Sequence, residues 1–532
     1  MTGTAPTRGV ALTSRQLALV FAGLMLGMLL AALDQTIVAT ALPTIVGELG
    51  GLNHLSWVVT AYLLTSTAST PLYGKLSDLY GRKQMFQLAI VMFLAGSVLA
   101  GLSQNMTQLV AFRAVQGLGA GGLMSMAMAI IGEVVSPRER GRYQGWLGAV
   151  FGLASVAGPL AGGLLTDNLS WRWVFYVNVP VGLVALGFTT FALNLPFRRR
   201  EHAIDYVGAA LLVAGVTSVL LVTVWGGGQY AWDSPLILGL AASGLVLLTV
   251  FFAWERRAAE PILPLHLFRN RVVAVATGMM FLIGLALFGA IVFLPVFLQI
   301  VAGASATNSG LLLLPLMGGI IVTSVVTGRL ITRTGRYKVF PVVGTFLILA
   351  GFALLATIGV GTSQALVSTY MVVLGAGIGA NMQVLVLAVQ NAVRPRDLGT
   401  ATSTASFMRS LGASFGTAIF GAILNARLTT ELARLLPAGA LPPGLDPEAL
   451  QGSPAQLLAL PPAVRDGLVH AFANSIHTVF LAALPIGVVL VLVVWLLPEL
   501  PLREQNLLDD GQAGGLAGAA PEAPVVAGRT AR

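Results

Sequence analysis

Long apolar stretches separated by short polar segments repeat along the chain from Leu17 to Leu497. A helix needs about 20 mostly apolar residues to cross the hydrocarbon core of a bilayer, and these stretches have about this length. The strands of a membrane barrel would instead show segments of about 10 residues with alternating polarity. The pattern therefore predicts fourteen membrane-spanning helices. We expect them at residues 17–43, 56–74, 85–104, 107–132, 142–166, 173–196, 205–226, 234–254, 272–301, 308–330, 339–359, 365–390, 400–426 and 476–498.

The composition excludes a soluble protein and offers no enzyme chemistry. Of the 532 residues, 56% are hydrophobic and 10% are charged, whereas a soluble domain carries about 25% charged residues. The chain has no cysteine and its five histidines are scattered, so we expect neither a metal site nor a cofactor. The stretch "GLGAGG" at 117–122 lies inside an apolar span without a neighbouring strand, so we expect no bound nucleotide and no enzyme activity.

The basic residues indicate topology rather than nucleic-acid binding. The net charge is +9, but most Lys and Arg residues occupy alternate short loops between the apolar stretches. Cytoplasmic loops of membrane proteins carry such an excess of basic residues. An even number of spans puts both termini on one side of the membrane, and the charges place that side in the cytoplasm.

An internal repeat divides the chain into two halves. The stretches "GKLSDLYGRK" from Gly74 and "GRLITRTGRY" from Gly328 share the pattern G-x-L-x-x-x-x-G-R. Two six-helix bundles in parallel repeat are a transporter architecture, so we expect an all-α membrane protein with two additional helices between the bundles. The expected parts are a cytoplasmic N-terminus 1–16, an N-terminal bundle 17–196, the two additional helices 197–271, a C-terminal bundle 272–498 with an extracytoplasmic loop 427–475, and a disordered cytoplasmic tail 499–532.

One acidic residue lies deep within a predicted span. The other acidic residues fall in loops, at span ends or in the tail, which leaves Asp34 alone inside 17–43. Ionisable residues within the membrane usually carry function, so Asp34 is a candidate proton carrier. Arg113, inside 107–132, lies at a similar predicted depth, and as a proton-coupling partner it would hold Asp34 ionised until solvent or substrate rearranges the pair. Two alternatives stay open: the two residues form a purely structural ion pair, or Arg113 bonds backbone carbonyls.

These motifs together resemble the major facilitator superfamily. "GKLSDLYGRK" resembles its signature loop, "LVAFRAVQGLGAG" from Leu109 its fourth-span motif, and "AGPLAGG" from Ala157 its exporter motif. "LDQTIVATALP" and "WRWVFYVNVP" resemble the fourteen-span drug:proton antiporter-2 branch. The chain departs from these patterns at Ala39 and Ala154, and Thr332 stands where the first-half loop has Asp78.

The resemblance implies a proton-coupled multidrug efflux antiporter of the bacterial cytoplasmic (inner) membrane, a class linked to antibiotic resistance. It implies that Asp34 couples transport to protons and that the two halves alternate access by rocking. The first-half loop and the exporter motif would act in this motion, although the loop charges also suit topology alone and the glycines also suit ordinary helix packing. The conformational residues are Gly74, Asp78, Gly81, Arg82, Lys83, Gly158, Pro159 and Gly162.

Polar and aromatic residues of the spans suggest a substrate cavity. An apolar wall with a few polar groups suits lipophilic ligands, although any single aromatic residue can equally face lipid. The candidates are Trp57, Tyr62, Gln116, Gln299, Asn381, Gln383 and Phe407.

We expect the cargo to be a small lipophilic cationic or neutral compound, exported in exchange for protons by a monomer that binds neither nucleic acid nor nucleotide. Two alternatives are export of an endogenous lipid, siderophore or metabolite by the same fold, and a membrane sensor or scaffold that transports nothing.

Overall fold

A computed structural model describes most of the chain, and all regular secondary structure in the described part is helical apart from one isolated bridge between Gly226 and Tyr230. The all-α class predicted from the sequence is confirmed. A bilayer core offers no water to unpaired backbone groups, so helices that satisfy their own hydrogen bonds suit this composition. The described residues are 14–49, 55–135, 137–193, 205–227, 229–304, 308, 311–394, 397–436 and 461–502.

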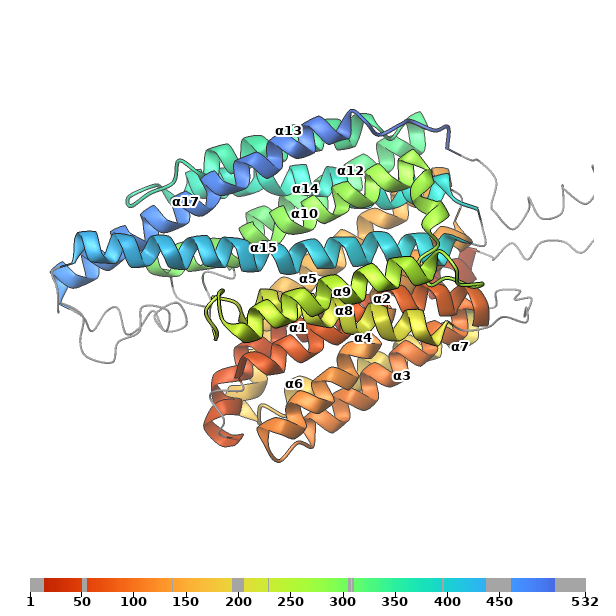
Figure 1. Cartoon of the computed structure of the whole chain (residues 1–532), viewed down its shortest axis with the longest axis horizontal. Helices are drawn as coiled ribbons and strands as arrows, with labels where there is room; N and C mark the ends of the chain where they lie inside the picture. The colour runs from red at the N-terminus through yellow and green to blue at the C-terminus, as the bar shows by residue number, and fades with distance from the viewer. Residues whose placement is uncertain are drawn as a thin grey trace, which may run out of the picture.

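The first bundle, red to yellow in Figure 1, is arranged around a buried central helix, α4. The α4 helix packs against α2 and α3, while α1 packs against α5 and α7. Asn105 begins α4 by accepting a hydrogen bond from the Gln108 backbone N–H at 2.9 Å, a normal N-cap. The helices are α1 (Ser14–Leu49), α2 (Leu55–Tyr80), α3 (Arg82–Gly101), α4 (Met106–Val134), α5 (Pro137–Asn168), α6 (Trp173–Tyr176) and α7 (Asn178–Ala192).

The second bundle repeats this packing around α14. The α14 helix is largely buried and packs against α12 and α13, while α10 packs against α15. The α14 helix is therefore the counterpart of α4. The helices are α10 (Arg271–Val296), which continues into the π-helical turn η3 (Phe297–Val301), then α12 (Leu314–Thr334), α13 (Val339–Leu355), α14 (Gln364–Ala392), α15 (Leu398–Leu435) and α17 (Pro462–Val494).

The bundles meet along two helix pairs, α2 with α15 and α5 with α12. Between the bundles in sequence lie α8 (Tyr206–Trp225), α9 (Pro235–Glu255) and the short 3₁₀ helix η2 (Leu265–Arg269). The α8 helix packs against α9 and also against both α2 and α15. The additional helices therefore cover the α2–α15 seam from outside (Figure 1).

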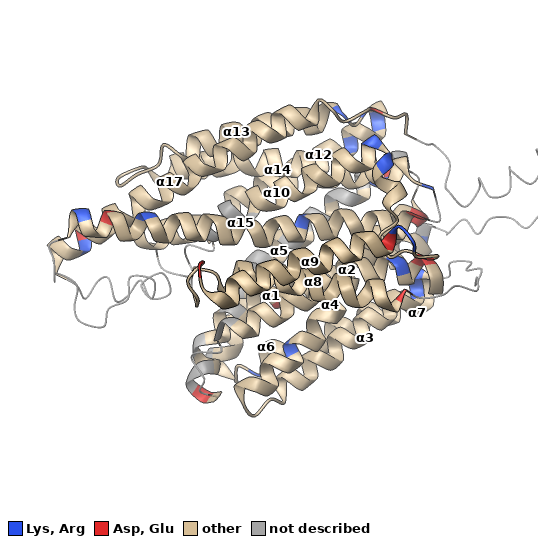
Figure 2. Cartoon of the chain, in the orientation of Figure 1, with Lys and Arg blue, Asp and Glu red and all other residues tan. Residues whose placement is uncertain are grey.

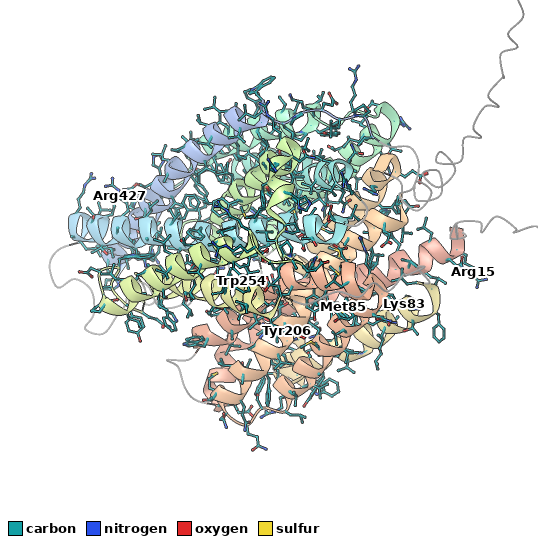
Figure 3. All side chains as sticks on the ribbon, turned by 45° about the vertical axis from the view of Figure 1, so that its right-hand side comes forward. Arg15, Lys83, Met85, Tyr206, Trp254 and Arg427 are labelled. Carbon is teal, nitrogen blue, oxygen red and sulfur yellow. The ribbon has the colours of Figure 1, made fainter. Side chains whose placement is uncertain are left out.

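The charged residues distinguish the two ends of the molecule. Arg15 and Lys83 lie at one end and Arg427 at the opposite end (Figure 3). We call these the basic end and the far end, because Figure 2 shows more Lys and Arg near the first than near the second.

The number of membrane crossings stays a prediction. Each of the fourteen predicted ranges overlaps a helix, but in the described part ten helices are long and apolar enough to cross a membrane, and α10 and α13 provide two shorter apolar segments. Neither α2 nor α5 is among them. For α2, hydroxyl-bearing residues lower its apolar character.

Two predicted segments differ from the structure. Both ends of the predicted loop 427–475 are helical, because α15 extends to Leu435 and α17 begins at Pro462. Residues 437–460 lie outside the described part. The predicted tail is ordered in its first residues, since the Tyr337 hydroxyl donates to the Pro498 carbonyl at 2.9 Å and accepts from the Leu500 N–H at 3.0 Å. Residues 1–13 and 503–532 lie outside the described residues.

Candidate functional site

A cavity of about 630 Å³ lies between the two bundles. Its wall is mostly apolar and is built by α1, α2, α4, α8, α10, α12, α14 and α15. Hydroxyl groups of Thr60, Ser66, Thr67 and Thr70 give α2 a polar stripe on this wall. The wall extends to Asn425 near the far end, so the cavity reaches toward that end.

The basic end is closed by direct contacts between the bundles. A Cβ placed on Gly74 would lie 1.9 Å from the Ser403 hydroxyl, so α2 and α15 pack too closely for any side chain there. Nearby, the Gln390 side-chain amide of α14 donates to the Met128 carbonyl of α4 at 3.0 Å. The structure therefore has one closed end and a cavity that reaches toward the other.

Asp34 lies at the centre of a buried polar network in the first bundle. It is 0% exposed and forms an ion pair with Arg113. The Gln116 amide donates to Asp34 at 2.7 Å and the Asn178 amide at 3.2 Å. Ser97 accepts from both amides and donates to the Phe175 carbonyl at 2.8 Å. Buried charges need partners of this kind.

Arg113 pairs with Asp34 and also bonds a backbone carbonyl. Besides its ion pair with Asp34, it donates to the Gln116 side-chain oxygen at 2.7 Å and, through Nε, to the Val58 carbonyl at 3.2 Å. Its guanidinium carbon also lies 4.2 Å from the centre of the Tyr62 ring, a cation–π distance. Every face of this cation is therefore engaged by the first bundle.

The network is separated from the cavity by Tyr62. Ala31, Ala32 and Gln35 line the cavity, whereas Asp34 does not, because it projects from the opposite face of α1. Tyr62 lines the cavity as well, and its hydroxyl donates to the Ala31 carbonyl at 3.2 Å. Tyr62 is 0% exposed and its ring contacts Arg113, so it lies between the cavity and the network, and a molecule in the cavity does not touch the carboxylate.

One atom beside Asp34 has spare hydrogen-bonding capacity. The side-chain oxygen of Asn178 is buried and has no partner among the described residues. Buried polar atoms are normally paired. This oxygen could accept a hydrogen bond from Asp34 if the carboxyl group gained a proton and the amide turned.

Asp78 connects the bundles at the basic end. Its carboxylate accepts hydrogen bonds from the Gly399 N–H at 3.2 Å and from the Thr400 N–H and hydroxyl at 2.9 and 3.0 Å. These donors form the N-terminus of α15, which favours a negative charge. Burial nevertheless raises the pKa of Asp78 to about 6, partly offset by Arg82 and the hydrogen bonds from Thr400 and Gly399.

The neighbouring loop residues hold Asp78 in place. Gly81 has φ 94, a conformation that favours glycine, and so permits the tight turn into α3. Arg82 pairs with Asp78 at 3.2 Å and donates to the Ala129 carbonyl at 2.6 Å, and Lys83 donates to the Thr190 carbonyl at 2.8 Å. Asp78 therefore pairs both with Arg82 and with a helix N-terminus, and that helix belongs to the other bundle.

The glycines of α5 allow it to approach α1 closely. A Cβ on Gly158 would lie 1.9 Å from the Thr36 hydroxyl, and one on Gly162 would lie 2.0 Å from the Thr40 hydroxyl. Thr36 also donates to the Ala154 carbonyl at 3.0 Å. The side chain of Pro159 lies outside the described part. These glycines therefore serve helix packing next to the segment that carries Asp34.

The sequence pattern of the Major Facilitator Superfamily matches residues 24–417. The chain belongs to the major facilitator superfamily. Its members are transporters, so the expectation of a membrane transporter that is not an enzyme is confirmed.

Named relatives and solved structures agree with this membership. An uncharacterised MFS-type transporter of Mycobacterium tuberculosis (strain H37Rv) is 47% identical over 91% of this chain and 70% of its own. The multidrug transporter protein MdtP of Bacillus subtilis is 43% identical over 77% of this chain and 75% of its own. The structure of the proton:xylose symporter XylE has the same fold, with a TM-score of 0.62 and 13% identity over 93% of this chain and 99% of its own.

Within this superfamily fold, the predicted cavity residues separate into two groups. Tyr62 and Gln383 line the cavity. The others do not: Trp57 makes an edge-to-face contact with Trp225, with ring centres 5.0 Å apart, and Phe407 packs with Ala68 against α8. Gln116 belongs to the Asp34 network.

The two remaining candidates also lie away from the cavity wall. Asn381 is 0% exposed and donates to the Gly377 carbonyl within α14 at 2.8 Å, and Gln299 lies in η3. Spans that are apolar all round conceal which face meets the cavity, so residue type alone could not sort these candidates.

Three residues of the network and the cavity were not among the predicted site residues. Asn178 and Ser97 belong to the Asp34 network, and only the occurrence of Asn178 in "WRWVFYVNVP" hinted at it. Arg409 lines the cavity.

Proposed function

We propose that the chain is a proton-coupled exporter of small lipophilic compounds in the bacterial cytoplasmic membrane, with the basic end and both termini in the cytoplasm. The observation that carries the proposal is the buried network in which Asp34 pairs with Arg113 beside the spare acceptor of Asn178. Burying a carboxylate within a membrane protein costs free energy, so such a group usually has a function. Here it has a cation that favours its charged form and an acceptor that would suit its protonated form.

The cavity supports a lipophilic cargo. Its walls combine aliphatic and methionine side chains, such as Leu63, Met124 and Met317, with scattered hydroxyl groups. Such walls bind apolar molecules of different shape because methionine side chains adapt easily. The name of the relative MdtP, a multidrug transporter, also favours this class of cargo.

Coupling in this proposal passes through Tyr62. Protonation of Asp34 removes the charge that holds Arg113, and the released guanidinium changes its stacking on Tyr62. A cargo that displaces Tyr62 acts on the same contact from the cavity side. The two events are therefore linked although cargo and carboxylate never meet, and binding linkage of this kind acts equally in both directions.

Alternating access in this proposal begins from the state described above. The closed basic end and the cavity that reaches toward the far end correspond to an outward-facing transporter. Release of the Asp78 contact with α15 would open the basic end. The helices α8 and α9 would then have to slide or rock with the α2–α15 seam that they cover.

Transport in proteoliposomes tests the proposal. With an imposed pH gradient, wild-type protein should drive uptake of a lipophilic dye into the acidic lumen of inside-out vesicles. Asp34→Asn should reduce this uptake to that of protein-free liposomes, because the amide cannot carry a proton. Asp466→Asn is a matched control, since this carboxylate is exposed on α17, and it should transport as wild type.

Two outcomes would overturn the proposal. Equal gradient-driven uptake by wild type and Asp34→Asn would exclude Asp34 as the proton carrier. No uptake of any lipophilic dye by wild type, together with an intact cellular phenotype in Asp34→Asn, would favour the sensor or scaffold.

A further inference from the structure

A single charged side chain, Arg409, stands on the described wall of the cavity. It projects from α15, which also contributes Ser406 and Ser410 to the lining, and Gln383 of α14 lines the same cavity. No acidic residue belongs to the described lining. Asp34, the acid of the first bundle, is 0% exposed and faces away from the cavity. The fixed charge that meets the cavity contents is therefore positive.

The Arg409 guanidinium lacks the partners that Arg113 has. Its Nε is buried without a hydrogen-bond partner among the described residues, and no carboxylate of the described part forms an ion pair with it. The side-chain oxygen of Gln383 on the same wall is also buried and unpartnered. Arg409 is partly exposed to the cavity. A cation beside an apolar cavity without a counter-charge is unfavourable, and charged groups in a membrane interior commonly mark the path of a substrate.

We propose that Arg409 binds the head group of an amphiphile with a single anionic group, such as a carboxylate, sulfonate or phosphate. The planar guanidinium donates two parallel hydrogen bonds to such groups. The apolar part of the same molecule would lie against Leu287, Met317 and Ile320 of the second bundle. The hydroxyl groups of α2, on the opposite wall, would form hydrogen bonds with polar atoms farther along the amphiphile.

This inference rests on the proposed export function and refines its cargo. It replaces the expectation of cationic compounds, because a cation in this cavity would meet the Arg409 charge and no acid. Neutral compounds stay compatible, since carbonyl or ether oxygens can accept from the guanidinium. The order of preference should be anion, then neutral compound, then cation.

Binding of three matched probes tests the preference. We suggest a dansyl-labelled undecyl chain that ends in a sulfonate, in a neutral methyl sulfonamide or in a trimethylammonium group, with protein in nanodiscs of zwitterionic lipid. Wild type should bind the sulfonate at least about tenfold more tightly than the neutral probe, as expected for a desolvated charge-assisted contact. Arg409→Gln should lose this difference and keep the affinity for the neutral probe, whereas Arg409→Lys should retain part of it.

Controls separate charge recognition from damage to the fold. Ser410→Ala changes a neighbouring residue of the same wall without changing charge, so it should preserve the order of the three probes. Equal wild-type affinity for all three probes, tightest binding of the trimethylammonium probe, or a sulfonate preference that survives Arg409→Gln would each overturn the proposal.

The source of the anionic group is tested in a second arm. Replacing part of the zwitterionic lipid by phosphatidylglycerol should weaken apparent sulfonate binding if a lipid head group occupies Arg409, and should leave it unchanged if the site selects free amphiphiles. Either result keeps the anionic preference. Uptake of the neutral probe by wild type and its loss in Asp34→Asn would show that proton-coupled export stands even if the Arg409 inference fails.

Discussion

The two bundles repeat one packing arrangement, but the arginines within their helices have different surroundings. In the first bundle, Arg113 on α4 has an acid, an amide, a backbone carbonyl and an aromatic ring around it. In the second bundle, Arg409 on α15 has an unpartnered Nε, and Gln383 on α14 has an unpartnered side-chain oxygen. The first cation is therefore neutralised by its own bundle, whereas the second has no counter-charge among the described residues.

The last turns of α2 and α12 also differ between the bundles. Asp78 reaches across to the N-terminus of α15. Thr332, which occupies the corresponding position, donates to the Gly328 carbonyl within its own helix at 2.9 Å. The ionisable group that joins the bundles at the basic end, Asp78, therefore comes from the first half. The charged group of the cavity wall, Arg409, comes from the second half.

The largest expected effect compares the buried Arg113 with the partly exposed Arg409. Arg113→Gln leaves Asp34 buried without its cation, so it should lower the free energy of unfolding by about 3–5 kcal/mol. Arg409→Gln removes an unpaired charge and should leave this free energy unchanged or raise it. Thermal or denaturant unfolding of both variants in the same detergent measures the difference.

If the Arg113→Gln protein is too unstable to be purified, a double variant still tests the comparison. Asp34→Asn combined with Arg113→Gln removes both charges, so it should recover much of the lost stability without recovering proton-driven export. Equal destabilisation by Arg113→Gln and Arg409→Gln would contradict the contrast between a paired and an unpaired cation.

Hydropathy and charge placement predicted much of this arrangement. Every predicted span overlaps a helix, and elimination of the other acids singled out Asp34, because a deep charge is conspicuous in an apolar segment. The pairing of Asp34 with Arg113 followed from their similar predicted depth. The sequence could therefore identify the members of the ion pair.

Orientation about each helix axis was harder to predict. Asn178 reaches Asp34 only because the short helix α6 and the start of α7 place it there, and no periodic pattern encodes that turn. Trp57 and Phe407 were expected in the cavity, but apolar and aromatic residues cover all faces of such helices, and both side chains meet neighbouring helices instead. The asymmetry between Arg113 and Arg409 likewise depends on neighbours distant in sequence.

A smaller effect concerns the contact that joins the two bundles. Because burial raises the pKa of Asp78 to about 6, the closed basic end binds a proton more readily than a state in which Asp78 is exposed to water with its ordinary pKa. Lowering the pH from neutral toward 6 and below should therefore favour the closed end. The ratio of closed to open states should change by at most about tenfold per pH unit for this one group.

Spin labels can measure this shift because the chain contains no cysteine. Gln84→Cys in α3 and Thr334→Cys at the end of α12 place two exposed labels on different bundles. The closed state, in which the two labels are closer together, should become more populated as the pH falls. In Asp78→Asn the population should not respond to pH in this range, and a wild-type shift of opposite sign would refute the assignment.

The smallest expected effect compares one asparagine from each bundle. Asn178 donates to Asp34 at 3.2 Å, whereas Asn381 donates to the Gly377 carbonyl of its own helix at 2.8 Å. Asn178→Ala removes a direct hydrogen bond to Asp34, so it should slow proton-driven export by roughly fivefold or less, the equivalent of about 1 kcal/mol for one hydrogen bond. Asn381→Ala should leave the export rate unchanged, although both asparagines are fully buried. Initial export rates under one imposed pH gradient distinguish the two variants, and an equal loss in both would mean that Asn178 acts through packing rather than through its contact with Asp34.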